Sequence, residues 1–319
     1  MTLKENCCKR AILIAGPTAS GKSKLAMTLA ERLNGAIVNT DSMQVYANLR
    51  IMTARPSPED EAKYPHYLYG HIPGEKAYSV GHWVRDTAAV VGAVWQHGRV
   101  AIFVGGTGLY FTGLEGGLSG IPPIADCIRG HWRRALEIRG PEALHRELAR
   151  RDRQMAERLC AHDGQRVIRA LEVFEATGKS LVDWHDRPHD NGPLADARIG
   201  RVVLEPERTM LYSRINARFE HMVERGAIDE VAALHVLGLD AGQPVMKAIG
   251  VAEIGCYLSG KTTLEEAIAQ AKTQTRHYAK RQETWFGQRM KDWPRRDPES
   301  FGGDFDRLAQ ALLDSWGLD

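Results

Sequence analysis

The 319-residue sequence lacks the features of disulfide-rich and membrane proteins. It holds only five cysteines, without C-x-x-C spacing, which argues against a disulfide framework and suits a reducing compartment. Cys7-Cys8 has no His or Cys at ligand spacing, so we expect no metal there. No apolar run reaches the about 18 residues of a membrane span, and segment 1–10 lacks the apolar stretch of an export signal. We therefore expect a cytoplasmic protein without a membrane partner.

A large excess of one charge is also absent, because 42 Lys and Arg face 40 Asp and Glu, a net charge of +2. The charges are nevertheless unevenly distributed. Residues 129–169 hold eleven Arg, no Lys and six acidic residues, and residues 270–296 hold eight Lys or Arg and two acidic residues. Two basic segments are consistent with a polyanionic partner, and equally with two solvated helix faces.

Short apolar runs that end at glycine or at polar residues predict buried parallel strands at 11–15, 36–38, 100–104 and 201–204. The segment 22–33 has a leucine at every fourth position and ends at Asn34-Gly35, which predicts a helix stopped by glycine. Because strand and helix alternate, we expect an α/β fold with a parallel sheet flanked by helices. Ligands of such sheets bind beyond the carboxyl ends of the strands.

The sequence pattern changes after Pro122-Pro123. Residues 124–178 have a helical, arginine-rich pattern, and residues 181–196 form a segment rich in Pro, Asp and His. We interpret the His and Asp residues at 183–190 as a solvated connection rather than a metal site. We predict a helical, arginine-rich insertion domain at 120–198 within a core of 1–119 and 199–319. Further helices are predicted at 210–224, 228–237 and 264–285, so the C-terminal part is helical.

The segment Gly16-Pro17-Thr18-Ala19-Ser20-Gly21-Lys22-Ser23 matches G-x-x-x-x-G-K-[ST], with a strand before it and a helix after it. The glycines let backbone N–H groups surround a phosphate, and the helix N-terminus adds a favourable dipole. Lys22 supplies a positive charge and Ser23 a hydroxyl for Mg²⁺. We therefore expect these eight residues to bind a di- or triphosphate with Mg²⁺ in a P-loop NTPase-like sheet.

A second segment, Gly255-Cys256-Tyr257-Leu258-Ser259-Gly260-Lys261-Thr262, matches the same pattern. No strand precedes it, since residues 252–258 have a helical pattern. Gly260 is typical of a helix stop, and Thr262 with Glu265 is typical of the capping box of a next helix. We therefore predict a structural role for this copy.

Polar or glycine-rich segments also follow two further predicted strands. Asp41-Ser42 follows 36–38, where a carboxylate can hold Mg²⁺ through water, accept a proton from a nucleophile, or cap a helix. Gly105-Gly106-Thr107-Gly108 follows 100–104, where an ordinary P-loop ATPase has an Asp that anchors Mg²⁺. The missing acid argues against an ATPase, and the glycines permit another chain or a flat base to approach the backbone.

Together with the phosphate loop, several motifs resemble those of the tRNA dimethylallyltransferases, also called tRNA isopentenyltransferases. They occur in the family's order and cover most of the chain. Their combination is much more specific than any one of them. The motifs are Asp41-Ser42-Met43-Gln44-Val45-Tyr46, Thr53-Ala54-Arg55-Pro56, Val104–Tyr110, Asp163–Arg166 with Arg169–Val173, Ala248-Ile249-Gly250, and Lys280-Arg281-Gln282 with Thr284-Trp285-Phe286.

The resemblance implies a reaction and its residues. Dimethylallyl diphosphate would donate its prenyl group to N6 of the adenine at position 37 of a tRNA, and the P-loop would hold the diphosphate leaving group. Asp41 would accept the N6 proton, Thr107 would lie near the reacting groups, and Arg218 would neutralise the diphosphate. Contacts with the anticodon stem-loop are implied for Asp41, Ser42, Met43, Gln44, Thr107, Arg129, Gln165, Arg166, Val167, Ile168, Arg169, Met246, Lys247, Ala248, Ile249, Gly250 and Val251.

The chemistry of this reaction agrees with the residues present. Cleavage of the allylic carbon–oxygen bond develops negative charge on the diphosphate, which cations and loop N–H groups stabilise. An exocyclic amine is a poor nucleophile and needs a proton acceptor held close to it. The base must leave its stack to reach a buried site, and the two basic segments would grip the RNA. We expect the protein to act as a monomer.

Two stretches depart from the family's pattern. Asn48-Leu49-Arg50-Ile51-Met52 replaces a more usual Gly-Met-Asp-Ile-Gly, and Val251 replaces a usual Tyr. We expect these changes to affect tRNA contacts rather than the reaction. A small-molecule P-loop kinase, an adenine-nucleotide isopentenyltransferase and a non-enzymatic RNA-binding protein remain alternatives. The kinase would need only a short lid, whereas the insertion is long. The adenine-nucleotide enzyme would not need two basic segments, and a non-enzymatic RNA-binding protein would not need Lys22 and Asp41 together. Trp285-Phe286 is interpreted as an anchor of the last long helix rather than a base-stacking surface.

Overall fold

The computed structural model describes residues 9–185 and 191–317. Cys7-Cys8 and the last residues of the segment 183–190 therefore lie outside the described residues. The chain divides into two compact units, with boundaries between Glu115 and Gly116 and between Asn191 and Gly192. We call the discontinuous unit the sheet unit and the internal one the helical unit.

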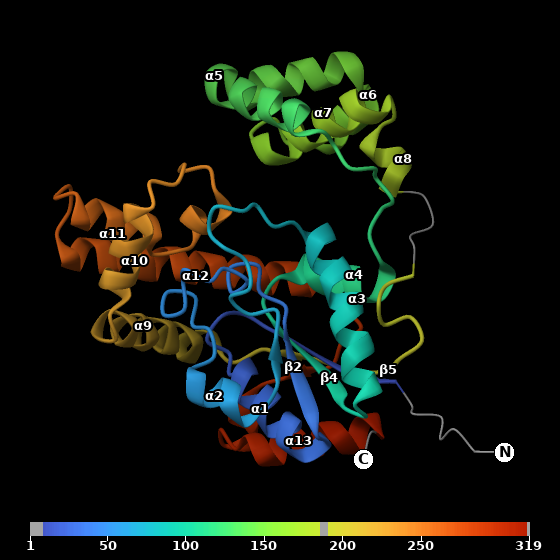
Figure 1. Cartoon of the computed structure of the whole chain (residues 1–319), viewed down its shortest axis with the longest axis vertical. Coiled ribbons are helices and arrows are strands. Elements are labelled where there is room, and N and C mark those ends of the chain that lie inside the picture. Colours follow the sequence, from blue (N-terminus) through green and yellow to red (C-terminus); the bar gives the residue numbers. More distant parts are fainter. Residues whose placement is uncertain (1–8, 186–190, 318–319) are drawn as a thin grey trace. The chain divides into compact units, whose positions relative to one another are not determined.

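The sheet unit is built on a parallel sheet whose strand order in the described residues is β3-β2-β4-β1-β5-β6. This confirms the predicted parallel α/β fold, and the sheet is visible at the centre of Figure 1. The two edge strands were not predicted, because two residues are too short to show a pattern. The strands are β1 (Arg10–Ala15), β2 (Gly35–Asn39), β3 (His66–Tyr67), β4 (Val100–Gly105), β5 (Arg198–Leu204) and β6 (Arg295–Arg296).

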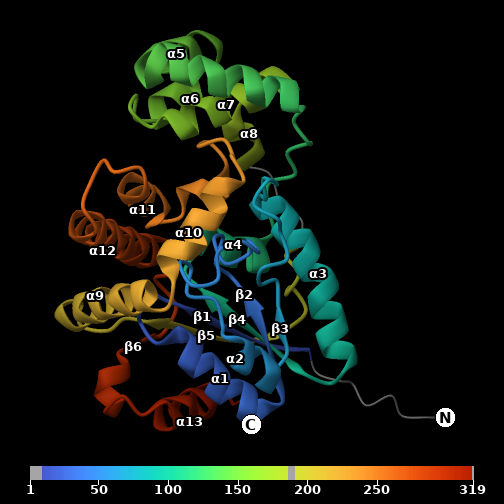
Figure 2. The same cartoon turned by 60° about the vertical axis from the view of Figure 1, so that its left-hand side comes forward.

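Helices cover both faces of this sheet, as Figure 2 shows. The predicted helix 22–33 is confirmed at its exact bounds, and those at 210–224, 228–237 and 264–285 are confirmed within a few residues. The helices of this unit are α1 (Lys22–Leu33), α2 (Pro58–Lys63), α3 (Val80–Gln96), α4 (Gly108–Gly116), α9 (Arg208–Glu224), α10 (Ala227–Val236), α11 (Val251–Leu258), α12 (Leu264–Arg289) and α13 (Phe305–Trp316).

Alternation along the buried strands sends their side chains into two apolar cores. Ile12 and Ile14 of β1 pack with α1 and α13 on one face, whereas Leu13 packs on the other face with Trp83 and Phe286. Each fully buried side chain of this size contributes roughly 1.5–3 kcal/mol to stability. The burial of Phe286, only 1% exposed, agrees with the interpretation of Trp285-Phe286 as an anchor of α12.

The helical unit consists of short and long helices around its own core. Trp132, Leu144, Leu148 and Leu171 are buried in it. Gly140 has a φ of 73° and precedes a proline, so α5 is broken into two helical parts there. The helices, drawn in green in Figure 1, are α5 (Asp126–Arg151), α6 (Arg153–Arg158), α7 (Gly164–Thr177) and α8 (Leu181–His185).

The second copy of the phosphate-loop pattern is part of a helix–turn–helix. Its first residues belong to α11, and Gly260 follows that helix with a left-handed φ of 72°. The predicted capping box is displaced by one residue, because Thr263 and Glu266, not Thr262 and Glu265, cap the start of α12. None of the helices in the described residues is long and apolar enough to cross a membrane.

Candidate functional site

Three polar segments lie at one edge of the sheet because they follow neighbouring parallel strands. The phosphate loop follows β1, Asp41 follows β2, and Gly105-Gly106-Thr107 follows β4, which lies between β1 and β2. Residues of each segment line a first cavity of about 420 Å³, with Gly105 as the contribution of the third. Its lining is mostly polar and comprises Thr18, Ala19, Ser20, Gly21, Lys22, Ser23, Lys24, Asp41, Gln44, Thr53, Ala54, Tyr69, Val104, Gly105, Arg214, Arg218 and Gln282.

The phosphate loop enters α1 through Gly21, which has a φ of 93°. A Cβ at this position would lie 2.7 Å from the ring of Phe305, so both the conformation and the neighbour require glycine. Lys22 Nζ donates to the carbonyl oxygen of Pro17 at 2.5 Å. Desolvation and the nearby Arg218 lower the pKa of Lys22 to about 7, although Asp41 acts in the opposite direction.

Arg218 is brought to the loop by α9, far away in the sequence. Its Nη2 donates a hydrogen bond to Thr18 Oγ1. Burial lowers the pKa of the guanidinium and Asp41 raises it. A second cation, Arg214, lines the same cavity one turn earlier on α9 and pairs with Glu299. The geometry therefore places two arginines and Lys22 around one space suited to an anion.

Asp41 sits in a tight turn rather than at the start of a helix. Its Oδ1 accepts from Met43 N at 2.9 Å, and Asn39 holds its backbone from both sides. Desolvation raises the pKa of Asp41, while the Met43 N–H, Lys22 and Arg218 oppose the rise. The alternative of a helix N-cap is wrong, because the next helix in this fully described stretch begins at Pro58. A carboxyl group with a raised pKa beside cations suits proton transfer.

Thr107 links the β4 turn to the residue after Asp41. Its Oγ1 accepts from Ser42 N at 3.0 Å and donates to Ser42 Oγ at 3.3 Å. Its backbone N donates to Thr40 O at 3.1 Å. Thr107 therefore reaches the site through Ser42.

A second cavity of about 270 Å³ meets the first at Thr18, Asp41, Thr53 and Arg218. Its remaining wall is largely apolar and includes residues predicted to contact tRNA. These further lining residues are Ser42, Met43, Met52, Ile215, Phe219, Met222, Lys247, Ala248, Ile249, Thr275, Tyr278 and Arg281. A polar and an apolar cavity that share Asp41 are suited to a ligand with a charged and an uncharged part.

The remaining predicted tRNA contacts of the sheet unit have different environments. Gln44 lines the first cavity and its Nε2 donates to Thr53 O and Ala54 O. Met246 packs on the core, and Gly250 is the N-cap of α11. Val251 is fully buried in the core, so its side chain is not available to a tRNA, contrary to the prediction.

The predicted departure at 48–52 is accommodated by one carboxylate of α10. Glu230 accepts hydrogen bonds from the backbone N of Arg50, Ile51 and Met52 at 2.6, 2.8 and 2.8 Å. The Met52 side chain is 7% exposed and enters the apolar wall of the second cavity. Methionine in place of the usual glycine at position 52 therefore narrows the second cavity, and Glu230 holds the backbone of the loop 50–52 in place.

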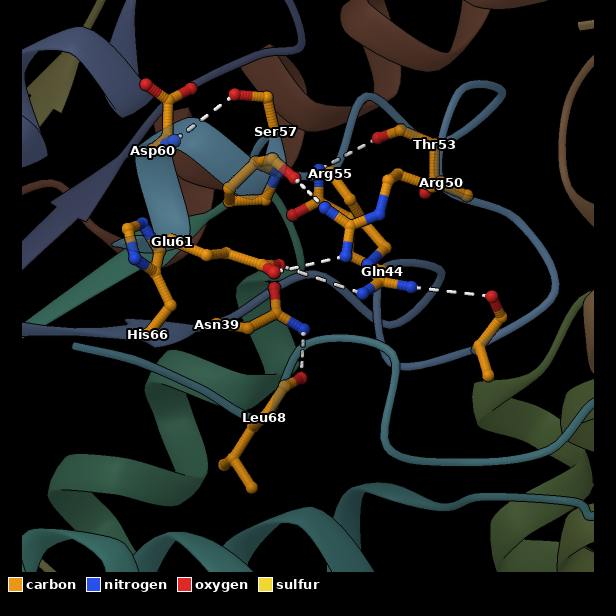
Figure 3. Close-up of polar contacts among 12 residues, drawn as sticks. Asn39, Gln44, Arg50, Thr53, Arg55, Ser57, Asp60, Glu61, His66 and Leu68 are labelled. Atoms are coloured by element: carbon orange, nitrogen blue, oxygen red, sulfur yellow. Dashed lines mark hydrogen bonds and ion pairs between the residues drawn. The ribbon is translucent and has the colours of Figure 1, made fainter. Parts of the chain in front are cut away.

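Further polar contacts fix the segment that follows this loop. Glu61 pairs with both Arg50 and Arg55, and Figure 3 shows dashed lines from its carboxylate to both guanidinium groups. The Gln44 amide reaches the backbone at Thr53 in the same view. This network holds Thr53, which lines both cavities.

Within the helical unit, the predicted tRNA contacts are divided between surface and core. In α7, Gln165 and Arg166 are exposed and Arg169 is half exposed, whereas the side chains of Val167 and Ile168 are buried. Arg129 lies on α5 and is partly buried. The exposed polar residues are therefore the ones available to a polyanion, and the two apolar residues support them.

Gln282 belongs to the motif at 280–286, but no role was predicted for it, and it proves central to the geometry. It lies on α12, is 5% exposed and lines the first cavity. Its side chain occupies the space above Gly106, where a Cβ would overlap Nε2. Gly105 similarly packs against Thr40, so the paired glycines admit the chain's own residues to the backbone, not a flat base. The Gly-Gly pair was the signal, and the distant partner could not be read from it.

A magnesium ion fits the site only if the ligand supplies most of its oxygens. The described residues contain no cluster of three or more His, Cys, Asp or Glu that could hold a metal by itself. Ser23 and Asp41 nevertheless line one cavity and offer a hydroxyl and a carboxylate. Mg²⁺ commonly binds with one or two protein ligands plus phosphate oxygens and water.

Two family models and two known proteins that match this chain are all described as prenyl transferases of one kind. A family described as IPP transferase matches residues 44–290, and one described as isopentenyl transferase matches residues 9–68. The chain is 52% identical over 295 residues to a tRNA dimethylallyltransferase of Bradyrhizobium sp. (strain ORS 278), covering 92% of this chain and 95% of that protein. A Rhizobium etli tRNA dimethylallyltransferase is 52% identical over 290 residues, with coverages of 90% and 97%.

Solved structures resemble the chain over most of its length. The full-length tRNA isopentenylpyrophosphate transferase of Bacillus halodurans is 32% identical, with a TM-score of 0.67 and coverages of 97% of this chain and 99% of that one. A eukaryotic dimethylallyltransferase described as acting on tRNA is 28% identical, with a TM-score of 0.73 and coverages of 87% and 70%.

Proposed function

The chain belongs to the IPP transferase family of tRNA dimethylallyltransferases, and we propose that dimethylallyl diphosphate and adenosine 37 of tRNA are its substrates. In the proposed reaction the dimethylallyl group moves to N6 of that adenosine, next to the anticodon, and diphosphate leaves. The observation that carries the proposal is the pair of cavities that meet at Asp41, one cationic and one largely apolar.

The first cavity is proposed to hold the diphosphate. Loop N–H groups, Lys22 and Arg218 would stabilise the charge that develops on the leaving oxygen. Bound Mg²⁺, held by Ser23 and the diphosphate oxygens, would neutralise part of the same charge. Arg218 and Thr18 are already hydrogen-bonded to each other, which supports a fixed position for the guanidinium.

Asp41 is proposed to accept the proton of the adenine amine. The second cavity beside it offers apolar contact with uncharged groups and side chains such as Lys247 and Arg281 for RNA. An extrahelical adenine is required, because the reacting atoms must meet inside the site. We further propose that exposed arginines of the helical unit contact the anticodon stem-loop, and that the enzyme is a cytoplasmic monomer.

The proposed substrates are tested by incubation with labelled dimethylallyl diphosphate and tRNA, AMP or no acceptor. We expect label in tRNA, and none in a tRNA transcript that carries guanosine at position 37. Label in AMP but not in tRNA would contradict the tRNA assignment. Turnover of ATP without prenyl transfer would favour a small-molecule kinase instead.

Diphosphate binding is expected to take up protons above about pH 7. The pKa of Lys22 is about 7 in the unliganded protein, so the amine is increasingly neutral above this pH. A bound diphosphate raises the pKa of Lys22 and restores the charge, and its affinity therefore falls as pH rises above about 7. Calorimetry in buffers of different ionisation enthalpy measures the uptake. Lys22→Arg stays charged and should remove it; an unchanged uptake in this variant would assign the proton elsewhere.

A further inference from the structure

Gln282 connects two parts of the site. One is the phosphate loop after β1, and the other is the turn after β4. Its Oε1 accepts from Thr18 N at 2.9 Å, and its Nε2 donates to Gly106 O at 2.9 Å. Both partners are far away in the sequence, and the side chain is 5% exposed. The bonds are therefore shielded from water, and leaving either partner unpaired would cost stability.

Each of the two bonds continues towards a reacting group. On one side, Thr18 Oγ1 accepts from Arg218, so the bond to Thr18 N fixes the residue that holds the guanidinium. On the other side, Gly106 precedes Thr107, whose Oγ1 accepts from Ser42 N. Ser42 follows Asp41, and its position is thereby fixed relative to the carboxylate. A single amide group thus stands between the leaving-group side and the proton-acceptor side.

The amide is suited to this role because it is both donor and acceptor. A backbone N–H faces it on one side and a backbone carbonyl on the other, so an acid or an amine of similar size could satisfy only one of them. Gly106 is required for the same contact, because a Cβ there would overlap Nε2. α12 itself is anchored by Phe286, which is fully buried one turn further on.

We propose that Gln282 is a positioning residue that sets the distance between the bound diphosphate and the Asp41 carboxylate. This inference rests on the proposed function. Gln282 acts through Thr18 and Gly106 and need not touch the substrate. Its contribution is geometric, since small displacements of reacting groups cost large factors in rate.

The first test is Gln282→Met, which keeps the length of the side chain and removes both bonds. We expect kcat for transfer to tRNA to fall about a hundredfold and the affinity for inorganic diphosphate to weaken about tenfold. Gln270→Met is the matched control, because Gln270 lies exposed on the same helix and should change neither quantity. If Gln282→Met does not fold, the same two quantities are measured in Gln282→Asn, whose side chain is too short to reach both partners, and the same direction of change is expected.

A double-mutant cycle distinguishes a bridge from simple structural support. Thr18→Ala and Thr107→Ala perturb the two halves separately, and we expect their effects on kcat to deviate from additivity by about fivefold or more. In the Gln282→Met background the two effects should combine within about twofold of additivity. Equal coupling in both backgrounds would overturn the proposal, as would an unchanged kcat with unchanged diphosphate affinity.

The two proposals fail in different ways. Absence of transfer by the unmodified protein would refute the proposed substrates. The diphosphate affinity of Gln282→Met needs no transfer and would still decide whether Gln282 holds the loop.

Discussion

Asp41→Asn is expected to lower kcat for prenyl transfer by about a thousandfold, because the amide cannot accept the adenine proton. The substitution is nearly isosteric, and the Asn oxygen can still accept from Met43 N as Asp41 does at 2.9 Å. The turn should therefore persist. Binding of dimethylallyl diphosphate should be equal or tighter, because a negative charge near the diphosphate is removed.

Single-turnover transfer of labelled donor to tRNA measures this loss, and equilibrium binding measures the affinity. Asp240→Asn is the matched control, because Asp240 Oδ1 accepts from the backbone N two residues later in the same way, at 2.6 Å, but is exposed. A loss of less than tenfold in Asp41→Asn would refute its role as proton acceptor. A parallel loss of donor binding would point to a structural role instead.

Lys22→Ala should weaken diphosphate affinity about a hundredfold and lower the rate of transfer by a similar factor. Removal of a cation that faces a buried charge costs about 2–5 kcal/mol, and loss of transition-state stabilisation adds to the effect on rate. Competition between labelled donor and inorganic diphosphate measures the affinity, and rapid quench measures the rate.

The second copy of the loop pattern supplies the control for this experiment. Lys261 follows Gly260 as Lys22 follows Gly21, but it is exposed in the turn between α11 and α12. Lys261→Ala is expected to leave both quantities unchanged. If the two alanine variants behaved alike, the assignment of the anion site to the first loop would be wrong.

The fold could be predicted where local pattern and burial agree. β1, α1 and β4 each have an apolar pattern and a glycine at or next to one end. The residues that the pattern marks as apolar are buried in the structure, so local pattern and tertiary packing favour the same element. β3 and β6 could not be predicted, because each consists of two residues that become strands only by pairing with a longer neighbour. The capping box was displaced because Thr262 and Thr263 both have a Glu three residues later, and sequence alone does not choose between them.

The candidate site was predictable only in part. The loop after β1 and Asp41 after β2 follow from strand–loop–helix order, and the proximity of Arg218 came from the family resemblance. The roles of Gln282 and Glu230 were missed because they depend on contacts between segments far apart in the sequence, although Gln282 itself lies in a recognised motif. The sequence shows methionine at position 52 where glycine is usual, but not where its side chain goes. That depends on whether the surrounding apolar residues leave room for it.

The contact between Gly21 and Phe305 links the phosphate loop to α13, almost the whole sequence away. During synthesis the loop leaves the ribosome early, whereas the helix that packs beneath it is made much later. Until then the apolar surface shared by Leu25, Leu29 and α13 stays open to solvent and to other chains. A chain shortened before α13 would keep all the proposed catalytic residues, yet it would present the cell with an aggregation-prone folding intermediate rather than a smaller enzyme.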